Sequence, residues 1–122
     1  MTIVKTNPSS EIVQAYNILN QMIDFKGICK RSLKRPSKYI FSKLDELLRL
    51  DLDKLPFTED MLSSWIEDNS DNLSNPYYRI RLNCDQVKDI RLKAQSTNTS
   101  QTTLVTLYLL NVYTIAKAEL RN

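Results

Sequence analysis

The sequence contains no histidine, one glycine and two cysteines among its 122 residues. The lack of histidine excludes a Ser-His-Asp triad, a Cys-His dyad, a histidine general base and any zinc site that needs histidine. Cys29 and Cys84 form no CxxC motif and cannot complete a four-cysteine metal site. The scarcity of glycine disfavours β-barrels, β-sandwiches and glycine-rich phosphate loops, and it favours helices. These absences remove most familiar enzyme chemistry and leave open only catalysis by carboxylates or lysine, so we expect no enzyme, no catalytic residue, no metal and no cofactor.

Long apolar runs are also absent. The most apolar stretch, residues 104–115, is interrupted by Thr106, Asn111 and Thr114, which makes it too short and too polar to span a bilayer. The first residues lack the apolar core of a secretory signal. These features predict a cytoplasmic protein with no membrane partner, in which both cysteines are reduced thiols.

Charge is abundant and is arranged in blocks. Residues 26–43 hold seven cations and no acid, whereas residues 45–71 hold nine acids and two cations. Residues 79–122 return to seven cations and three acids, and the net charge of the chain is +3. Blocks of one sign mark surfaces that meet partners, although a solvated helix face is the alternative.

Apolar residues at helical spacing predict three helices in the first part of the chain, over residues 7–27, over residues 36–51 and from residue 58 onward. The only glycine, Gly27, is expected to end the first helix, and Thr58 is expected to cap the third. The very polar segment 68–76 predicts a boundary between an N-terminal helical unit (1–75) and a second unit (76–122). No internal repeat is apparent in the sequence.

One segment has the period of a strand. Tyr78, Ile80 and Leu82 alternate with Arg79 and Arg81, which predicts a short strand with one apolar and one polar face. A lone strand needs a partner for its backbone groups, and no convincing second strand is seen nearby. We therefore expect the partner strand to come from a second copy of the chain, as an antiparallel ribbon.

A turn and two predicted helices follow this strand. The first helix is capped by Asn83 or Asp85, Asn98-Thr99-Ser100 forms the turn, and a long helix follows it. This segment resembles the ribbon-helix-helix repressors of the Arc and MetJ kind. The resemblance rests on the order of the strand, the first helix with Ala94 near its end, the turn, and the second helix with Leu104-Val105 near its start. Asn98 stands where glycine is usual, and asparagine also tolerates a left-handed backbone.

The resemblance implies a mainly α fold in which residues 76–122 form a ribbon-helix-helix unit that dimerises through an intermolecular two-stranded ribbon. It implies sequence-specific binding of double-stranded DNA, as a transcriptional repressor or as an accessory factor of a plasmid or mobile element (partition or relaxosome). The two-fold axis of such a dimer implies a palindromic or directly repeated site. The implied base-reading residues are Tyr77, Arg79 and Arg81. The implied phosphate-binding residues are Asn83, Thr99, Ser100 and Gln101.

Alternative interpretations accompany these assignments. Arg79 and Arg81 also suit the solvent face of an edge strand, where charge discourages aggregation. A second basic patch could bind phosphates, an acidic protein surface or only water, and it comprises Lys30, Arg31, Lys34, Arg35 and Lys38. The alternative function is a non-enzymatic inhibitor or adaptor of the phage-antagonist kind, which would bind a protein partner. The N-terminal unit could also mediate a higher oligomer.

Overall fold

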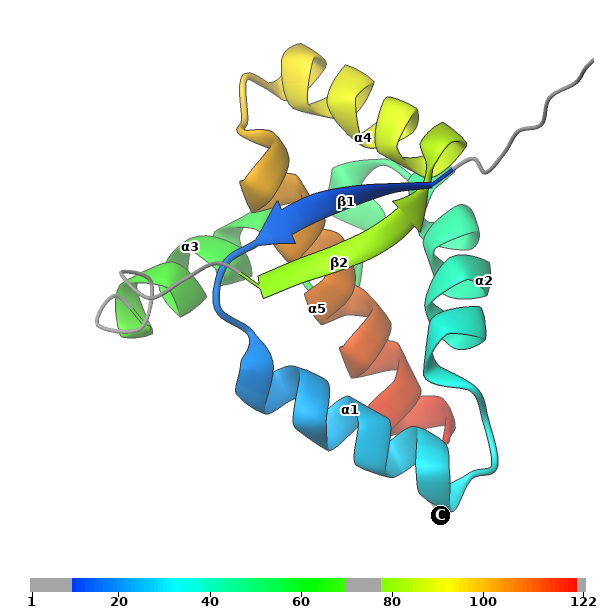
Figure 1. The fold of residues 1–122 in the computed structure, drawn as a ribbon. Coiled ribbons are helices and arrows are strands. Elements are labelled where there is room, and N and C mark those ends of the chain that lie inside the picture. The colour runs from blue at the N-terminus through cyan, green and yellow to red at the C-terminus, as the bar shows by residue number, and fades with distance from the viewer. Residues whose placement is uncertain (1–9, 70–77, 121–122) are drawn as a thin grey trace, which may run out of the picture.

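The computed structural model describes residues 10–69 and 78–120, and this part of the chain is mainly helical, as predicted. Figure 1 shows a two-stranded ribbon lying across a group of helices. In chain order the elements are β1 (Ser10–Ala15), α1 (Leu19–Arg31), α2 (Pro36–Leu48), the short 3-10 helix η1 (Leu52–Lys54), α3 (Glu59–Asp68), β2 (Tyr78–Asn83), α4 (Cys84–Thr97) and α5 (Gln101–Glu119).

The ribbon forms within one chain. Strands β1 and β2 are antiparallel, and their register runs from the Ser10–Asn83 pair to the Ala15–Tyr78 pair. Strand β2 confirms the strand predicted from its alternation. The expectation that no partner strand lies in the same chain is wrong, because β1 supplies one. The partner strand expected from a second copy is therefore replaced by an internal one. Dimerisation stays a prediction, but the need of β2 for a partner strand no longer supports it.

Strand β1 lies inside the segment where a helix was expected. Ile12, Tyr16 and Leu19 have helical spacing, which produced that wrong prediction. The side chains that β1 buries are instead Val13 and Ala15, which are two positions apart. β-Branched residues suit a strand, and pairing with β2 overrides the local helical pattern.

Helix α1 also ends later than expected. Gly27 lies within α1, so the prediction that it ends a helix is wrong. The helix continues because Ile28 and Cys29 are buried in the next turn. The left-handed residue that follows α1 is Leu33, with φ of 56°.

Other helix starts agree with the sequence. Helix α2 begins at Pro36, and the Thr58 hydroxyl accepts a hydrogen bond from the Met61 amide (3.4 Å) at the start of α3. Asn83 Oδ1 accepts from the Asp85 and Gln86 amides at 2.8 and 3.1 Å, which caps α4. These caps are local, because each polar side chain satisfies an amide two or three residues away.

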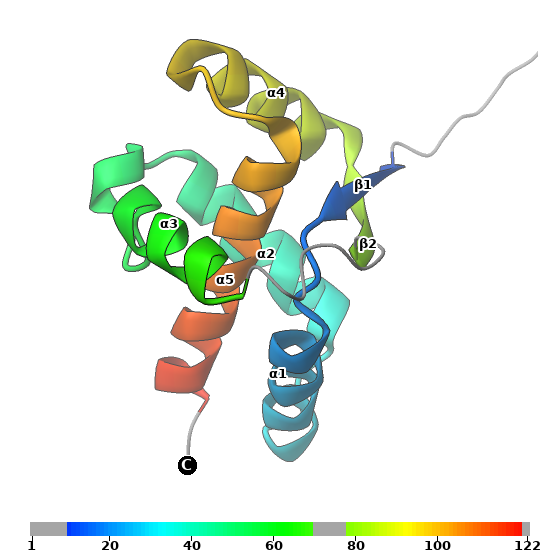
Figure 2. The ribbon, with the colours of Figure 1, turned by 90° about the vertical axis from the view of Figure 1, so that its left-hand side faces the viewer.

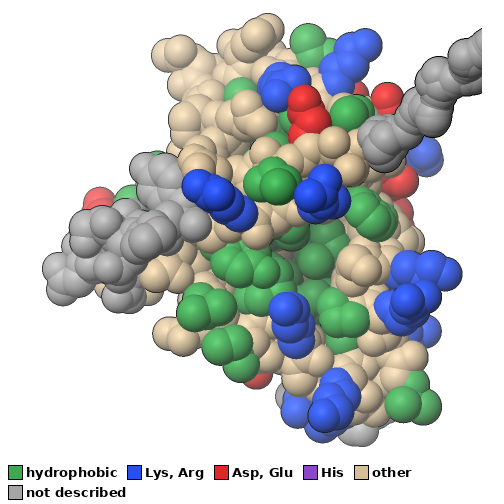
Figure 3. Space-filling model, viewed as in Figure 1, with side chains coloured by type: hydrophobic (Ala, Val, Ile, Leu, Met, Phe, Trp, Pro, Cys, Tyr) green, Lys and Arg blue, Asp and Glu red, His purple; other side chains and the backbone are tan. Residues whose placement is uncertain are grey.

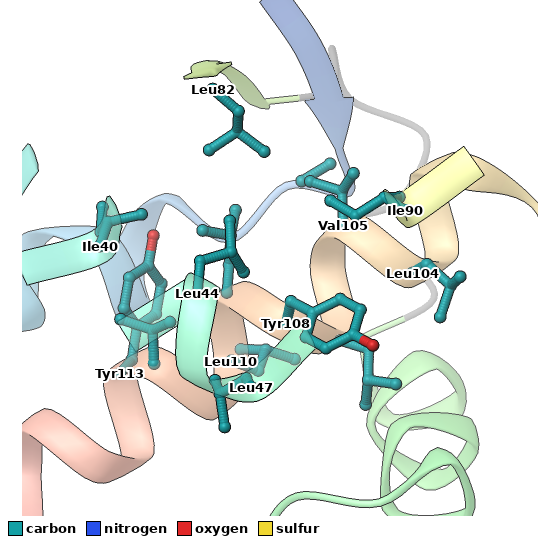
Figure 4. Packing of buried hydrophobic residues seen from close by; sticks show 14 of the residues in the cluster. Ile40, Leu44, Leu47, Leu82, Ile90, Leu104, Val105, Tyr108, Leu110 and Tyr113 are labelled. Atoms are coloured by element: carbon teal, nitrogen blue, oxygen red, sulfur yellow. The ribbon is translucent and has the colours of Figure 1, made fainter. Parts of the chain in front are cut away.

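Helix α5 is the centre of the molecule. All residues from 104 to 113 are buried, as expected of a helix that is apolar nearly all round. Helices α1, α2 and α4 and strand β1 pack against it, and Figure 4 shows side chains of α2, α4 and β2 around Tyr108 and Tyr113. Helix α3 lies beside α5 in the view of Figure 2. The expected units 1–75 and 76–122 thus contribute to one hydrophobic cluster in the described residues.

Buried polar side chains hold neighbouring segments against this core. Asn111 Oδ1 accepts from the Phe57 amide (2.7 Å), and its Nδ2 donates to the carbonyls of Phe57 (2.8 Å) and Leu107 (2.9 Å). The Thr106 hydroxyl accepts from the Tyr16 amide at 2.9 Å. These bonds tie the segment before α3 and the end of β1 to α5.

The element order strand–helix–helix occurs twice, as β1-α1-α2 and as β2-α4-α5. The first helices begin at Leu19 and Cys84, and the second helices begin at Pro36 and Gln101, which in both cases are 65 positions apart. Between the helices, the left-handed residues Leu33 and Asn98 have the same separation. Buried residues repeat with this offset in the pairs Met22/Val87, Phe25/Ile90, Cys29/Ala94, Ile40/Val105, Leu44/Leu109 and Leu47/Val112. The fold therefore contains a structural repeat that the sequence did not reveal.

Candidate nucleic-acid interface

The outer side of the ribbon carries four exposed side chains, which we call the ribbon face: Ile12 and Gln14 from β1, and Arg79 and Arg81 from β2. The register places Ile12 opposite Arg81 and Gln14 opposite Arg79. Residues with the opposite orientation are buried or half-buried, and Val13 and Leu82 are among the buried ones. The alternation of each strand thus gives the ribbon one side that packs on the helices and one side that meets solvent.

Positive charge characterises this side of the molecule. Figure 3 shows Lys and Arg side chains over the ribbon, over α4 and toward the connection between α1 and α2, with few Asp or Glu side chains. Arg81 Nη1 donates to Ser10 Oγ at 3.2 Å, so its guanidinium is directed along the ribbon. Next to this face, burial raises the pKa of the half-buried Tyr78, which keeps the phenol neutral.

A shallow hollow joins the ribbon face to the start of α5. It measures about 380 Å³ and is lined by Ile12, Gln14, Arg79, Arg91 and Gln101, among others. The structure therefore brings together Arg79, predicted to read bases, and Gln101, predicted to bind phosphate. Arg91 of α4 was not predicted for this site.

Arg91 is oriented by an ion pair across to the ribbon. Its Nη2 lies 3.2 Å from Oε2 of Glu11 on β1. Glu11 Oε2 itself is shielded from solvent, but the Arg91 and Glu11 side chains are 54% and 38% exposed, so the pair adds only about 0–1 kcal/mol to stability. Its effect is to hold a guanidinium beside the hollow.

The other predicted phosphate-binding residues serve the helix starts. The side-chain oxygen of Asn83 (Oδ1) already accepts the two hydrogen bonds that cap α4. The Ser100 hydroxyl accepts from the Thr103 amide (3.0 Å) and caps α5, while Thr99 Oγ1 donates to the Thr97 carbonyl (3.2 Å). The first amides of α5, at Gln101 and Thr102, have no acceptor within the helix, as at any helix start.

The second basic patch lies at the end of α1 and the start of α2. Its five side chains, Lys30, Arg31, Lys34, Arg35 and Lys38, are all exposed. Lys34 and Arg35 occupy, in the first strand–helix–helix unit, the positions that Thr99 and Ser100 occupy in the second. Arg31 also lines a hollow of about 650 Å³ together with Lys117 and Glu119 near the end of α5.

Not all of the predicted set falls within the described residues. Tyr77 lies outside them. Conversely, Ile12, Gln14 and Arg91 belong to the site without having been predicted. Ile12 and Gln14 were missed because β1 was taken for a helix, and Arg91 was missed because its position beside the ribbon depends on how α4 packs.

Other kinds of site were also sought. Residues 10–69 and 78–120 contain no group of three or more Cys, Asp or Glu side chains that could hold a metal ion. No helix in this same part of the chain has the length and apolar character needed to cross a membrane. Comparisons of the chain with family models, curated proteins and solved structures found no match. The resemblance to ribbon-helix-helix proteins thus stays a prediction.

Proposed function

We propose that this protein binds double-stranded DNA in a sequence-specific manner, with the ribbon face in the major groove. The observation that carries the proposal is the ribbon face itself, on which Arg79 and Arg81 stand beside Gln14 in register. A two-stranded ribbon fits the width of the major groove. The role requires no catalytic group, and it suits either a repressor or an accessory factor of a plasmid or mobile element.

The side chains of the ribbon face have the chemistry that base reading needs. An arginine fork can donate two parallel hydrogen bonds to O6 and N7 of guanine. Glutamine can pair in the same bidentate manner with N6 and N7 of adenine. Charge alone would be enough to keep a solvated edge strand from aggregating. That interpretation does not account for Ile12 and Gln14, which line the same hollow as Arg79.

Both flanks of the ribbon can provide contacts to phosphate. Gln101 and Thr102 at the start of α5 line the hollow, and a helix start favours an anion. In the equivalent position of the first unit, Lys34, Arg35 and Lys38 surround the start of α2. The second basic patch would then be the counterpart of Thr99, Ser100 and Gln101.

The structural repeat suggests how a single chain could form a ribbon-helix-helix arrangement. We infer that one chain forms a counterpart of the ribbon-helix-helix arrangement, in which β1-α1-α2 takes the place of the second copy. The antiparallel ribbon, the offset of 65 positions and the packing of α1, α2 and α4 on α5 support this inference.

The test is fluorescence anisotropy of the full chain with duplexes selected from a random pool, over a salt series. We expect the double variant Arg79→Ala/Arg81→Ala to lose its sequence preference. If each arginine makes one bidentate base contact, the binding free energy for the selected duplex should weaken by about 2–6 kcal/mol.

The matched control is Arg49→Ala/Lys54→Ala, which removes the same charge from two exposed positions, one directly after α2 and one in η1. This control should bind nearly as tightly as the wild type. Equal losses in both double variants would show that only net charge matters. No binding at moderate salt would refute DNA binding and would favour a protein partner.

A further inference from the structure

The ribbon face lacks the two-fold symmetry of a ribbon made from two identical chains. Its four side chains form a grid of two cross-strand pairs, Ile12 opposite Arg81 and Gln14 opposite Arg79. A rotation of 180° about the centre of this grid, at the Val13–Ile80 pair, would exchange Ile12 with Arg79 and Gln14 with Arg81. Each exchange brings together residues of different charge and size.

We propose that the protein recognises a non-palindromic duplex as a single chain, in one orientation, with β2 over guanines and β1 over adenine and thymine. This inference rests on the proposed DNA binding and specifies its target. A palindromic duplex has two-fold symmetry, and a face without that symmetry cannot match both of its halves equally well. The palindromic or directly repeated site implied by the family resemblance assumed two identical strands, and β1 and β2 are not identical.

The assignment of bases follows from the side chains. Arg79 and Arg81 suit guanine, and Gln14 suits adenine. Ile12 is 56% exposed, and an apolar side chain on this face suits the methyl group of thymine. The β1 side of the grid therefore favours A·T pairs, and the β2 side favours G·C pairs.

The flanks of the ribbon differ in the same sense. Lys34 and Arg35 are exposed cations beside the start of α2, whereas their counterparts Thr99 and Ser100 are neutral. Pro36 has no amide to offer a phosphate, whereas its counterpart Gln101 has one. One flank would thus contact phosphate through cationic side chains and the other through helix amides, which adds to the directionality of the complex.

The experiment selects duplexes from a random pool with the full wild-type chain and measures stoichiometry and affinity by anisotropy. We expect a non-palindromic consensus bound by one chain. Two palindromes, each built by inverted duplication of one half of that consensus, should bind at least about tenfold more weakly, the effect of one lost base contact.

Two variants then assign the sides. Gln14→Ala should relax the preference at adenine and leave the guanines unchanged, while Arg79→Ala should do the opposite. Gln95→Ala, which removes an exposed glutamine from α4, is the control and should change neither preference.

The outcomes separate the two proposals. A palindromic consensus bound by two chains would overturn this inference while leaving DNA binding intact. A loss of the same preference in Gln14→Ala and Arg79→Ala would overturn the assignment of bases to strands. No binding, or binding without sequence preference, would overturn both the inference and the proposed function.

Discussion

Asn111 offers the sharpest test of how the core is held together. Its side chain is fully buried in α5 and makes three hydrogen bonds, two of them to the backbone of Phe57. In Asn111→Ala the amide and carbonyl of Phe57 would lose their partners. An unpaired buried polar group costs about 1–3 kcal/mol, and two such groups would be left, so we expect the free energy of unfolding to fall by about 2–6 kcal/mol.

The assay is urea unfolding followed by circular dichroism. With a slope of about 2 kcal/mol per molar urea, such a loss lowers the unfolding midpoint by about 2 M. The control is Thr114→Ala, an exposed position one turn later in α5, which should stay within about 0.5 kcal/mol of the wild type. A loss of less than about 1 kcal/mol in Asn111→Ala would show that water or a shift of the loop replaces these bonds, and it would refute the argument.

Three further predictions concern other buried or paired groups. The hydroxyl of Tyr108 is buried without a hydrogen-bond partner in the described residues, so Tyr108→Phe should be neutral or raise the unfolding free energy by up to about 1 kcal/mol; a clear loss would reveal an unseen partner. Cys84 is exposed whereas Cys29 is buried with a raised pKa, so a thiol reagent should modify one cysteine rapidly in the native protein and the second only on unfolding; two fast thiols would contradict this packing. Hydrogen bonds from Lys43 and Tyr39 lower the pKa of Glu119. The contribution of Glu119 to stability should therefore be present above about pH 4.3 and be lost as the pH falls through the lower pKa of the folded state. Glu119→Gln should flatten this part of the plot of unfolding free energy against pH, and an unchanged plot would show that the contacts are too solvated to matter.

The sequence predicted those parts of the fold that depend on neighbouring residues. Thr58 caps a helix where expected, and Asn83, one of the two predicted candidates, caps α4, because a cap joins a side chain to an amide only a few positions away. The alternation of Tyr78, Ile80 and Leu82 similarly predicted β2, since a strand shows its two faces in its own period.

The parts that failed depend on distant segments. Ser10–Ala15 becomes a strand because β2 pairs with it, and no local pattern contains that information. Gly27 stays helical because burial of the following turn outweighs its weak helix propensity. Half of the ribbon face was therefore hidden, and the exposed arginines of β2 were the half that could be identified.

A signal for the missing half was nevertheless present in the chain. Positions 65 apart match in Gln21 and Gln86, in Asp24 and Asp89, and in Leu44 and Leu109. Such sparse matches are hard to see without the helix starts, because burial constrains size and polarity more than identity. Only the helix starts and the two left-handed residues, Leu33 and Asn98, make the offset of 65 positions evident.

The internal pairing of β1 with β2 also determines how the fold responds to dilution. When a ribbon is shared between separate chains, mass action dissociates it at low concentration and the melting temperature depends on the amount of protein. Here the connecting segment keeps the two strands at a high effective concentration whatever the number of molecules present. The ribbon is therefore a unimolecular structure, which can persist in a cell that contains only a few copies of the protein.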